Sequence, residues 1–224
     1  MSSKGRAPRN DQDFYPTPPW VIESLLDNVI LPGGAWIEPC AGDGVIIKTA
    51  RAIRQDIDWW AVELRPEAQS SLELALAPGN GSGTSGEPPG ELLIGNFLQL
   101  ELNGPDVNLQ HEKFAVAITN PPYIIAEAVI RHARKMADFT VMLLRTNFLG
   151  SAGRADWLRQ DMPDVYQLPH RPSFRADGAT DSIEYAWMIW PPEVRSQGQV
   201  TILPLVDSHL RKRTTILPLK AIKP

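Results

Sequence analysis

The sequence predicts an α/β fold with an open, mostly parallel sheet of seven strands and helices on both faces. Short apolar segments alternate with amphipathic segments through residue 144, as they do where crossover helices join parallel strands. Two apolar segments then follow at 185–190 and 199–203 with no helical pattern between them, which predicts an antiparallel hairpin at one edge. Sheets of this kind bind ligands at the carboxyl ends of their strands, so the turns after the strands are the candidate site.

Local patterns place each element. Thr17 can cap a helix over 18–29, where apolar residues recur at helical spacing and prolines occupy the first turn. Similar patterns predict further helices over 45–53, 66–76 and 124–137. The continuous apolar run at 114–118 is typical of a strand buried on both faces. The other expected strands cover 35–38, 58–63, 92–94, 139–144, 185–190 and 199–203, whereas 145–182 is polar and irregular.

Composition limits the class of protein. The chain has 224 residues, 43% of them hydrophobic, which suits one domain with a sizeable core. A formal charge of −4 excludes a protein that coats nucleic acid by bulk charge, although a local basic face stays open. The single cysteine excludes a disulfide framework and a cysteine-rich zinc site, and no metal is expected. Without a signal peptide or a long apolar run, we expect a soluble, cytoplasmic protein with no membrane partner.

Three regions are expected along the chain. Residues 1–13 form a flexible arm, residues 14–206 form the main domain, and residues 207–224 form a basic tail. Within the domain, the low-complexity segment 78–90 (PGNGSGTSGEPPG) cannot contribute to a core and is expected to be a flexible surface loop.

The turn after the first strand, Glu38-Pro39-Cys40-Ala41-Gly42-Asp43-Gly44, has two glycines that allow a ligand to approach the backbone. It lacks the spacing of a dinucleotide site and the Gly-Lys-Ser/Thr of a phosphate loop, which argues against ATP hydrolysis. Glu63 ends the next strand, where a carboxylate commonly accepts hydrogen bonds from ribose hydroxyls, and Glu38 could bind an amino group. A plain turn followed by a solvated Glu63 is the alternative. Cys40 is interpreted as a packed thiol, not a nucleophile.

The turn after the fourth strand is Asn120-Pro121-Pro122-Tyr123. Two prolines fix the backbone and leave carbonyl groups beside the amide oxygen of Asn120. Two rigid acceptors directed at one point suit a planar amino group such as the 6-amino group of adenine. Holding both of its hydrogens from outside the ring plane favours a pyramidal nitrogen with a free lone pair. Tyr123 can stack on the base.

Taken in order, Phe14-Tyr15-Pro16-Thr17-Pro18, the 38–44 turn, Glu63 and the Asn-Pro-Pro-Tyr tetrad resemble the S-adenosylmethionine-dependent amino-methyltransferases. The sequence is most similar to the DNA adenine-N6 methyltransferases of phage and restriction systems, over roughly residues 13–190. The resemblance implies a Rossmann-like class I methyltransferase fold, with residues 14–206 as the catalytic domain. It also implies S-adenosylmethionine as cofactor, held by Phe14, Tyr15, Thr17, Pro18, Glu38, Ala41, Gly42, Gly44, Glu63, Leu64, Asn96 and Phe97. The catalytic residues it implies are Asn120, Pro121, Pro122 and Tyr123.

Two features depart from this family. Asn96 stands where an acidic residue usually contacts the cofactor adenine, which predicts a weaker contact. No separate target-recognition domain fits in the chain, so short or relaxed sequence specificity is expected. The segment Arg171-Pro172-Ser173-Phe174 is similar to the family's late motif, which makes Phe174 the candidate contact for a flipped base, with ordinary loop packing as the alternative.

DNA is the expected partner, and residues 145–182 are the expected target-binding loop. This segment contains Arg145, Arg154 and Arg171, which could contact phosphates, although a solvated surface is the alternative for any single arginine. Two other hypotheses stay open. The same chemistry also serves enzymes that methylate adenine in RNA or a glutamine in a protein, and a non-catalytic subunit of a heteromeric methyltransferase would have a related sequence.

Overall fold

The computed structural model describes residues 16–78, 90–102, 104, 107, 112–174 and 182–211. The predicted arm, Phe14, Tyr15, nearly all of the low-complexity segment and most of the basic tail lie outside these residues.

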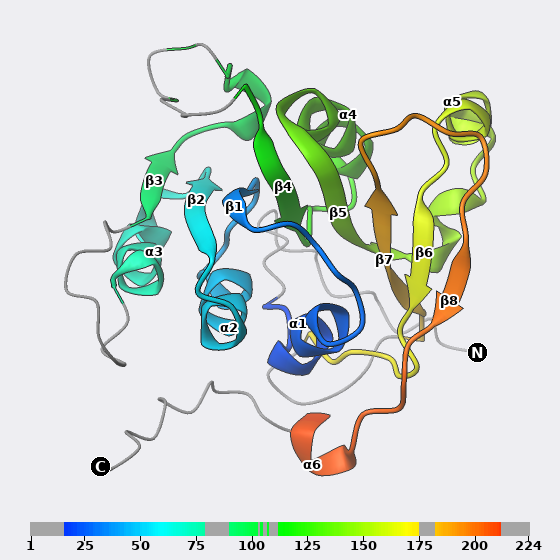
Figure 1. Cartoon of the computed structure of the whole chain (residues 1–224), viewed down its shortest axis with the longest axis horizontal. Coiled ribbons are helices and arrows are strands. Elements are labelled where there is room, and N and C mark those ends of the chain that lie inside the picture. Colours follow the sequence, from blue (N-terminus) through cyan, green and yellow to red (C-terminus); the bar gives the residue numbers. More distant parts are fainter. Residues whose placement is uncertain are drawn as a thin grey trace, which may run out of the picture.

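Within the described residues, eight strands form one sheet in the order β3-β2-β1-β4-β5-β7-β6-β8 (Figure 1). The strands are β1 (Gly34–Glu38), β2 (Ile57–Glu63), β3 (Glu91–Ile94), β4 (Phe114–Thr119), β5 (Ala137–Arg145), β6 (Asp164–Gln167), β7 (Tyr185–Trp190) and β8 (Val200–Ile202). The strands from β1 to β5 pair in parallel, β7 is antiparallel to both β5 and β6, and β8 is parallel to β6. The predicted mostly parallel sheet with an antiparallel edge region is confirmed.

The edge differs from the prediction in one respect. The two late strands do not pair as a hairpin, because the eighth strand, β6, lies between β7 and β8. The segment Asp164–Gln167 (DVYQ) contributes only Val165 as a fully buried side chain, so it carries no strong apolar signal. Its strand conformation depends on the ladder that pairs Val165 with Met188 and Tyr166 with Trp187.

The helices cover both faces of the sheet (Figure 1). Helices α1 (Pro19–Leu26), α2 (Val45–Ile53) and α3 (Gln69–Leu76) contribute to a core cluster with Trp36, Val116 and Trp187. Helices α4 (Ala126–Met136) and α5 (Ala155–Gln160) contribute to a second cluster with Ile37 and Ala117. Neighbouring residues of β1 and β4 thus face opposite clusters, as the alternation of side chains along a strand requires. The remaining elements are α6 (Ser208–Arg211) and the 3-10 turns η1 (Pro66–Ala68), η2 (Phe97–Gln99), η3 (Thr146–Leu149) and η4 (Ala152–Arg154).

The start of α1 differs from the sequence prediction. Pro18, in an extended conformation, is the residue at the N-cap, and no side chain caps the helix there. Thr17 lies one residue too early for this role, and its hydroxyl contacts another part of the chain. Among the described residues, no helix is long and apolar enough to cross a membrane.

Candidate functional site

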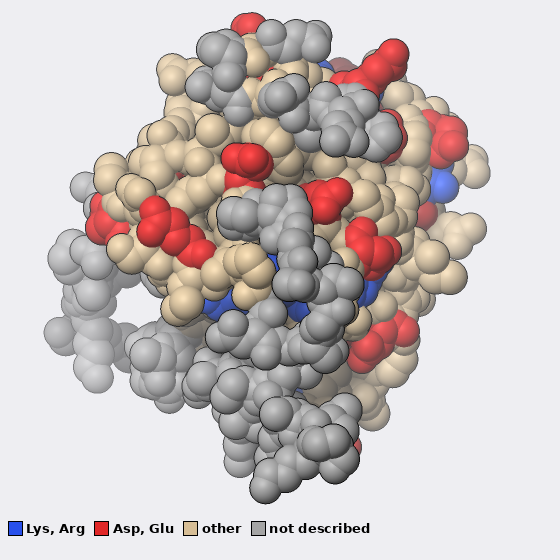
Figure 2. Space-filling view, turned by 60° about the vertical axis from the view of Figure 1, so that its left-hand side comes forward, with Lys and Arg blue, Asp and Glu red and all other residues tan. Residues whose placement is uncertain are grey.

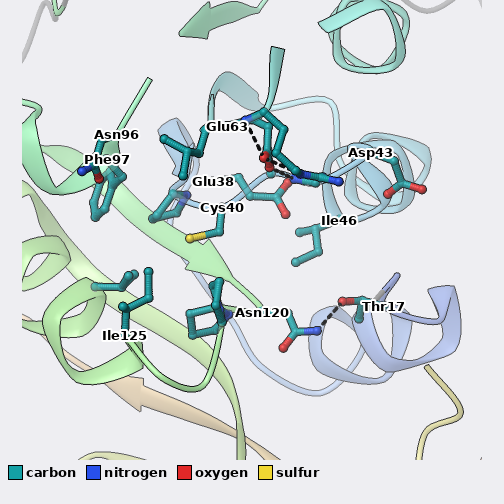
Figure 3. A pocket seen from close by; sticks show the side chains of 18 of the residues that line it. Thr17, Glu38, Cys40, Asp43, Ile46, Glu63, Asn96, Phe97, Asn120 and Ile125 are labelled. Atoms are coloured by element: carbon teal, nitrogen blue, oxygen red, sulfur yellow. Dashed lines mark hydrogen bonds and ion pairs between the residues drawn. The ribbon is translucent and has the colours of Figure 1, made fainter. Parts of the chain in front are cut away.

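A cavity of about 470 Å³ opens at the carboxyl ends of β1, β2, β3 and β4 (Figure 3). It brings together the 38–44 turn and the Asn120–Tyr123 turn that the sequence singled out, although these residues are far apart in the chain. Twelve of the predicted site residues line it: Thr17, Glu38, Ala41, Gly42, Glu63, Leu64, Asn96, Phe97, Asn120, Pro121, Pro122 and Tyr123. The cavity walls are therefore built from the predicted cofactor residues on one side and the Asn-Pro-Pro-Tyr turn on the other.

The glycines of the 38–44 turn have different roles. Gly42 lines the cavity with a φ of 59°, and its N–H donates to Oε2 of Glu63 at 2.7 Å. Gly44 does not line the cavity; it has a φ of 77° and a Cβ there would lie 2.7 Å from Cβ of Ala75 on α3. A glycine is thus favoured at position 44 because the backbone there is left-handed and because α2 and α3 pack closely, whereas Gly42 borders the cavity.

Glu63 is a preorganised carboxylate at the end of β2. Its Oε2 accepts the Gly42 N–H, and its Oε1 accepts the backbone N–H and the Nε–H of Arg65 at 3.0 and 2.8 Å. Oε2 accepts one hydrogen bond and keeps a second lone pair, so these contacts orient Glu63 and still allow it to accept from a ligand. Arg65 also lines the cavity, and the sequence analysis missed it because a strand-end arginine carries no periodic signal.

Glu38 is an acceptor buried in the wall of the cavity. Its side chain is 2% exposed, and Oε2 has no hydrogen-bond partner among the described residues. Burial raises the pKa of this carboxyl well above its ordinary value, and the nearby Asp43 and Glu63 carboxylates raise it further; the Ile47 N–H acts in the opposite direction. An unpaired buried carboxylate oxygen is costly, so the site suits a ligand with a cationic or N–H donor group.

Asn120 is held by the segment that precedes α1. Its Nδ2 donates to Oγ1 of Thr17 at 3.1 Å, and the amide oxygen points away from Thr17 (Figure 3). The adjacent Thr119 hydroxyl donates to the Cys40 carbonyl at 3.3 Å, which ties this turn to the 38–44 turn. The Pro122 carbonyl accepts the Ile125 N–H at 3.1 Å and so is not unpaired, contrary to the simplest expectation for a Pro-Pro turn.

Tyr123 lines the cavity and also belongs to an aromatic cluster with Tyr185 and Phe174. The Arg145 guanidinium lies 4.2 Å from the centre of the Tyr123 ring, and Arg145 Nε donates to the Tyr185 hydroxyl at 3.3 Å. The ring of Tyr185 lies 6.1 Å from that of Tyr123 and 4.9 Å from that of Phe174. Phe174 itself is 6% exposed and does not line the cavity. In this structure Phe174 packs in the core against Tyr185 and presents no open face to a base.

The arginines that were expected to contact nucleic-acid phosphates make contacts within the chain in this structure. Arg171 pairs with Glu184 at 2.5 Å, and Arg154 donates to the Phe148 carbonyl and lies over the Phe148 ring. Together with Arg145, they lie outside the cavity lining. Figure 2 shows acidic side chains scattered over the face on the β3 and α3 side, with few basic side chains visible there. That face offers no broad basic surface among its described residues.

The remaining predicted residues are placed as follows. Leu64 is 68% exposed at the cavity mouth, and Phe97 is buried in the wall. Asn96 is exposed, and its Oδ1 accepts the Leu98 N–H at 3.1 Å, so the side chain also caps η2. Pro18 does not line the cavity. Pro16, from the Phe14–Pro18 motif, also lines the cavity. Sequence reasoning missed lining residues with no chemical signature: Val45, Ile46, Leu98, Ile124, Ile125 and Val129.

Cys40 lies in the cavity wall as a protonated thiol. Burial raises its pKa to about 12, and the Glu63 and Glu38 carboxylates contribute in the same direction. A thiol of that acidity is not a nucleophile near neutral pH, in agreement with its interpretation as a packed side chain.

Comparison with known proteins supports the fold. No family model matches the chain. No curated protein sequence matches it either. A predicted O-methyltransferase, protein Atu636 from Agrobacterium tumefaciens, superposes with a TM-score of 0.53 at 18% identity, over 83% of this chain and 84% of that one.

Two further solved structures are similar at lower scores. A precorrin-6y C5,15-methyltransferase from Geobacter metallireducens GS-15 has a TM-score of 0.49 at 14% identity, over 77% and 86% of the two chains. A methyltransferase from Pyrococcus furiosus has a TM-score of 0.48 at 13% identity, over 78% and 82%. At these identities the first match shows the fold alone. With the strand order of this chain and its cavity at the strand ends, this match leads to one conclusion: the chain has a Rossmann-like fold of the kind found in methyltransferases.

Proposed function

We propose that this protein transfers a methyl group from S-adenosylmethionine to the exocyclic N6 amine of adenine in DNA. The observation that carries the proposal is that the Asn120-Pro121-Pro122-Tyr123 turn lines the same cavity as Glu38 and Glu63. Under this proposal, the binding site for the target amine and the binding site for the cofactor lie in the same cavity. Residues 14–206 would form the catalytic domain.

The cavity fits the cofactor on three chemical grounds. The unpaired Oε2 of Glu38 suits the ammonium group of the methionine part, and Glu63 suits the ribose hydroxyls. Leu64 and Phe97 supply apolar surface for the adenine ring. When bound, S-adenosylmethionine supplies an electrophilic methyl group on a sulfonium. A bound ammonium group would favour the ionised form of Glu38, and burial would then strengthen their interaction because few water molecules compete for the carboxylate.

Asn120 and Pro121 would hold the target amine. Since the Pro122 carbonyl is bonded to Ile125, we assign the Pro121 carbonyl and Asn120 Oδ1 as the two acceptors. An adenine amine is a poor nucleophile while its lone pair is conjugated with the ring. Two acceptors that bind its hydrogens outside the ring plane favour the pyramidal form and release the lone pair for attack. The methylated amine is acidic and loses its proton readily, so the site needs no strong base.

Tyr123 would stack on the target base at the mouth of the site. The exposed side chains of Ile124 and Leu64, 86% and 68% accessible, extend this apolar rim. Because a base inside a duplex cannot reach such a cavity, the proposal requires base flipping or a single-stranded substrate. Arg145, the last residue of β5, lies over the Tyr123 ring, and we propose that the segment 145–182 approaches the nucleic acid.

Expression in a methylation-deficient bacterium tests the proposal directly. Genomic DNA from cells expressing the wild-type protein is analysed by long-read modification sequencing, beside cells expressing Asn120→Ala. New N6-methyladenine in the wild-type sample alone is the expected result, and the sequence context would show how much the chain recognises. Absence of the mark would contradict the DNA proposal.

A panel with purified protein and radiolabelled cofactor separates the remaining substrates. Adenine-containing DNA, adenine-containing RNA and a glutamine-containing peptide are offered at equal concentrations. Methyl transfer to RNA or peptide alone would support the proposed amine methylation but would reject DNA as the substrate. Cofactor binding without transfer to any of them would favour a non-catalytic subunit.

A further inference from the structure

We infer that Thr17 is a positioning residue that holds the Asn120 side chain with its oxygen available to the target amine. This inference rests on the proposed function, because it assigns the orientation of the acceptor used in that reaction. It gives Thr17 a role different from both helix capping and simple contact with the cofactor.

The contact joins residues that are 103 positions apart. Nδ2 of Asn120 donates to Oγ1 of Thr17 at 3.1 Å, and Thr17 is 6% exposed. Figure 3 shows the Asn120 amide nitrogen directed toward Thr17 and the amide oxygen directed away from it. Because the Thr17 hydroxyl is buried, few solvent molecules compete for this acceptor.

Orientation matters because the two ends of a carboxamide are opposite in function. The oxygen accepts hydrogen bonds, whereas the nitrogen only donates them. If the amide turned by 180°, its N–H group would face the N–H group of the target amine, and one of the two acceptors would be lost. In the observed orientation the Thr17 hydroxyl accepts from Nδ2, which leaves Oδ1 for the target amine.

Thr17 is itself placed by the core. It lies directly before Pro18, the N-cap of α1, and Trp20, Val21 and Ile22 of this helix are buried. The Val21 carbonyl accepts the Trp187 indole N–H at 2.9 Å, which fixes the first turn of α1 to β7. On the other side, Thr119 binds the Cys40 carbonyl. Both partners of the contact are thus anchored, so the Thr17 hydroxyl acts as a fixed point and not as a mobile side chain.

Two substitutions of Thr17 and one matched control test the inference. Thr17→Val keeps the shape and removes the hydroxyl, while Thr17→Ser keeps the hydroxyl. Thr49→Val is the control, because Thr49 is 2% exposed and its hydroxyl donates to the Val45 carbonyl at 2.8 Å within α2, away from the cavity. For Thr17→Val we expect kcat to fall about tenfold, while the dissociation constant of S-adenosylmethionine changes less than about twofold. Thr17→Ser should keep most of the wild-type kcat, and Thr49→Val should affect stability alone.

Three outcomes would overturn the inference. These are a wild-type kcat in Thr17→Val, an equal loss of kcat in Thr17→Ser and Thr17→Val, and a loss in Thr17→Val that lies entirely in cofactor affinity. A measurement without turnover separates this inference from the proposed function. In ¹⁵N NMR spectra, the Asn120 side-chain NH₂ resonances, assigned with Asn120→Asp, should shift and exchange faster with water in Thr17→Val but not in Thr49→Val. Unchanged resonances would reject the positioning role even if the protein methylates DNA, and changed resonances would support it even if the substrate is different.

Discussion

The N–H of Gly42 lies 2.7 Å from Oε2 of Glu63, and this hydrogen bond joins the turn after β1 to the end of β2. The other oxygen of the same carboxylate binds Arg65 through two N–H groups. One side chain thus organises two adjacent strand ends and the wall of the cavity. A carboxylate held in this way loses little freedom when it binds a ligand hydroxyl.

Glu63→Gln should weaken cofactor binding about tenfold, because a neutral amide is a poorer acceptor for ribose hydroxyls and no longer pairs with Arg65. Isothermal titration calorimetry with S-adenosylmethionine measures this. Glu73→Gln is the matched control, since Glu73 is exposed on α3 and only binds Gln69 there. Equal affinities in wild type and Glu63→Gln would remove Glu63 from the cofactor site.

Glu38→Gln should stabilise the cofactor-free protein at neutral pH and weaken cofactor binding about 100-fold. Burial raises the folded-state pKa of Glu38, so its neutral form is the one that the folded protein favours. Stability from this group is fully present below the unfolded-state pKa and is lost as pH rises through the folded-state pKa. The Tm of Glu38→Gln should therefore exceed that of wild type by an amount that grows as pH increases from about 4. A Tm difference that is constant with pH would contradict the assignment of Glu38 as the buried, unpaired acid.

Asn120→Ala should fold and bind the cofactor but lose about 100-fold in kcat, because one of the two acceptors for the amine is removed. Cofactor affinity should stay within about twofold of wild type, since Glu38 and Glu63 are unchanged. Single-turnover methylation and calorimetry on the same preparation separate the two effects. A wild-type turnover rate in this variant would contradict the role of Asn120 as an acceptor for the target amine.

Gly44→Ala should destabilise the protein by about 1–3 kcal/mol through backbone strain and overpacking. The residue has a φ of 77°, and a Cβ there would lie 2.7 Å from Ala75. Gly150→Ala is the control, because its φ is −90° and a Cβ would meet its nearest atom at 3.7 Å. Urea unfolding of both variants gives the comparison; equal midpoints would show that α2 and α3 adjust without cost.

Cys40 offers a chemical probe of the cavity, because it is the single cysteine of the chain. Its pKa of about 12 keeps the thiol protonated at pH 7.5, so alkylation by iodoacetamide should be far slower than for a free thiol. The rate should increase with pH and should fall when S-adenosylmethionine is present, since Cys40 lines the cavity. Mass spectrometry of the intact protein follows both rates. Labelling that is fast at neutral pH, or unaffected by the cofactor, would contradict this placement.

Hydrophobic spacing in the sequence predicted helices α1 to α4 and seven of the eight strands close to their observed bounds, but not the short helices α5 and α6. α2, expected over 45–53, spans Val45–Ile53. Most of the predicted elements are recognisable because they have their own apolar residues facing a core cluster, whereas β8 is exposed. β6 was missed for the opposite reason. Its segment has one fully buried residue, and only its neighbours β7 and β8 make it a strand.

For the site, the sequence by itself determined which strand ends meet at the cavity: Glu38, Glu63 and Asn120 stand where strands end, and parallel strands bring those ends to one edge. Only the tertiary structure decided how these groups are partnered. Thr17 hydrogen-bonds to Asn120 and does not cap a helix, and Arg65 pairs with Glu63. One oxygen of Glu38 has no hydrogen-bond partner among the described residues. The spacing of apolar residues along a chain indicates which face of a helix or strand each residue occupies. The hydrogen bond between Thr17 and Asn120, 103 positions apart, forms only when the whole sheet and helix α1 are in place.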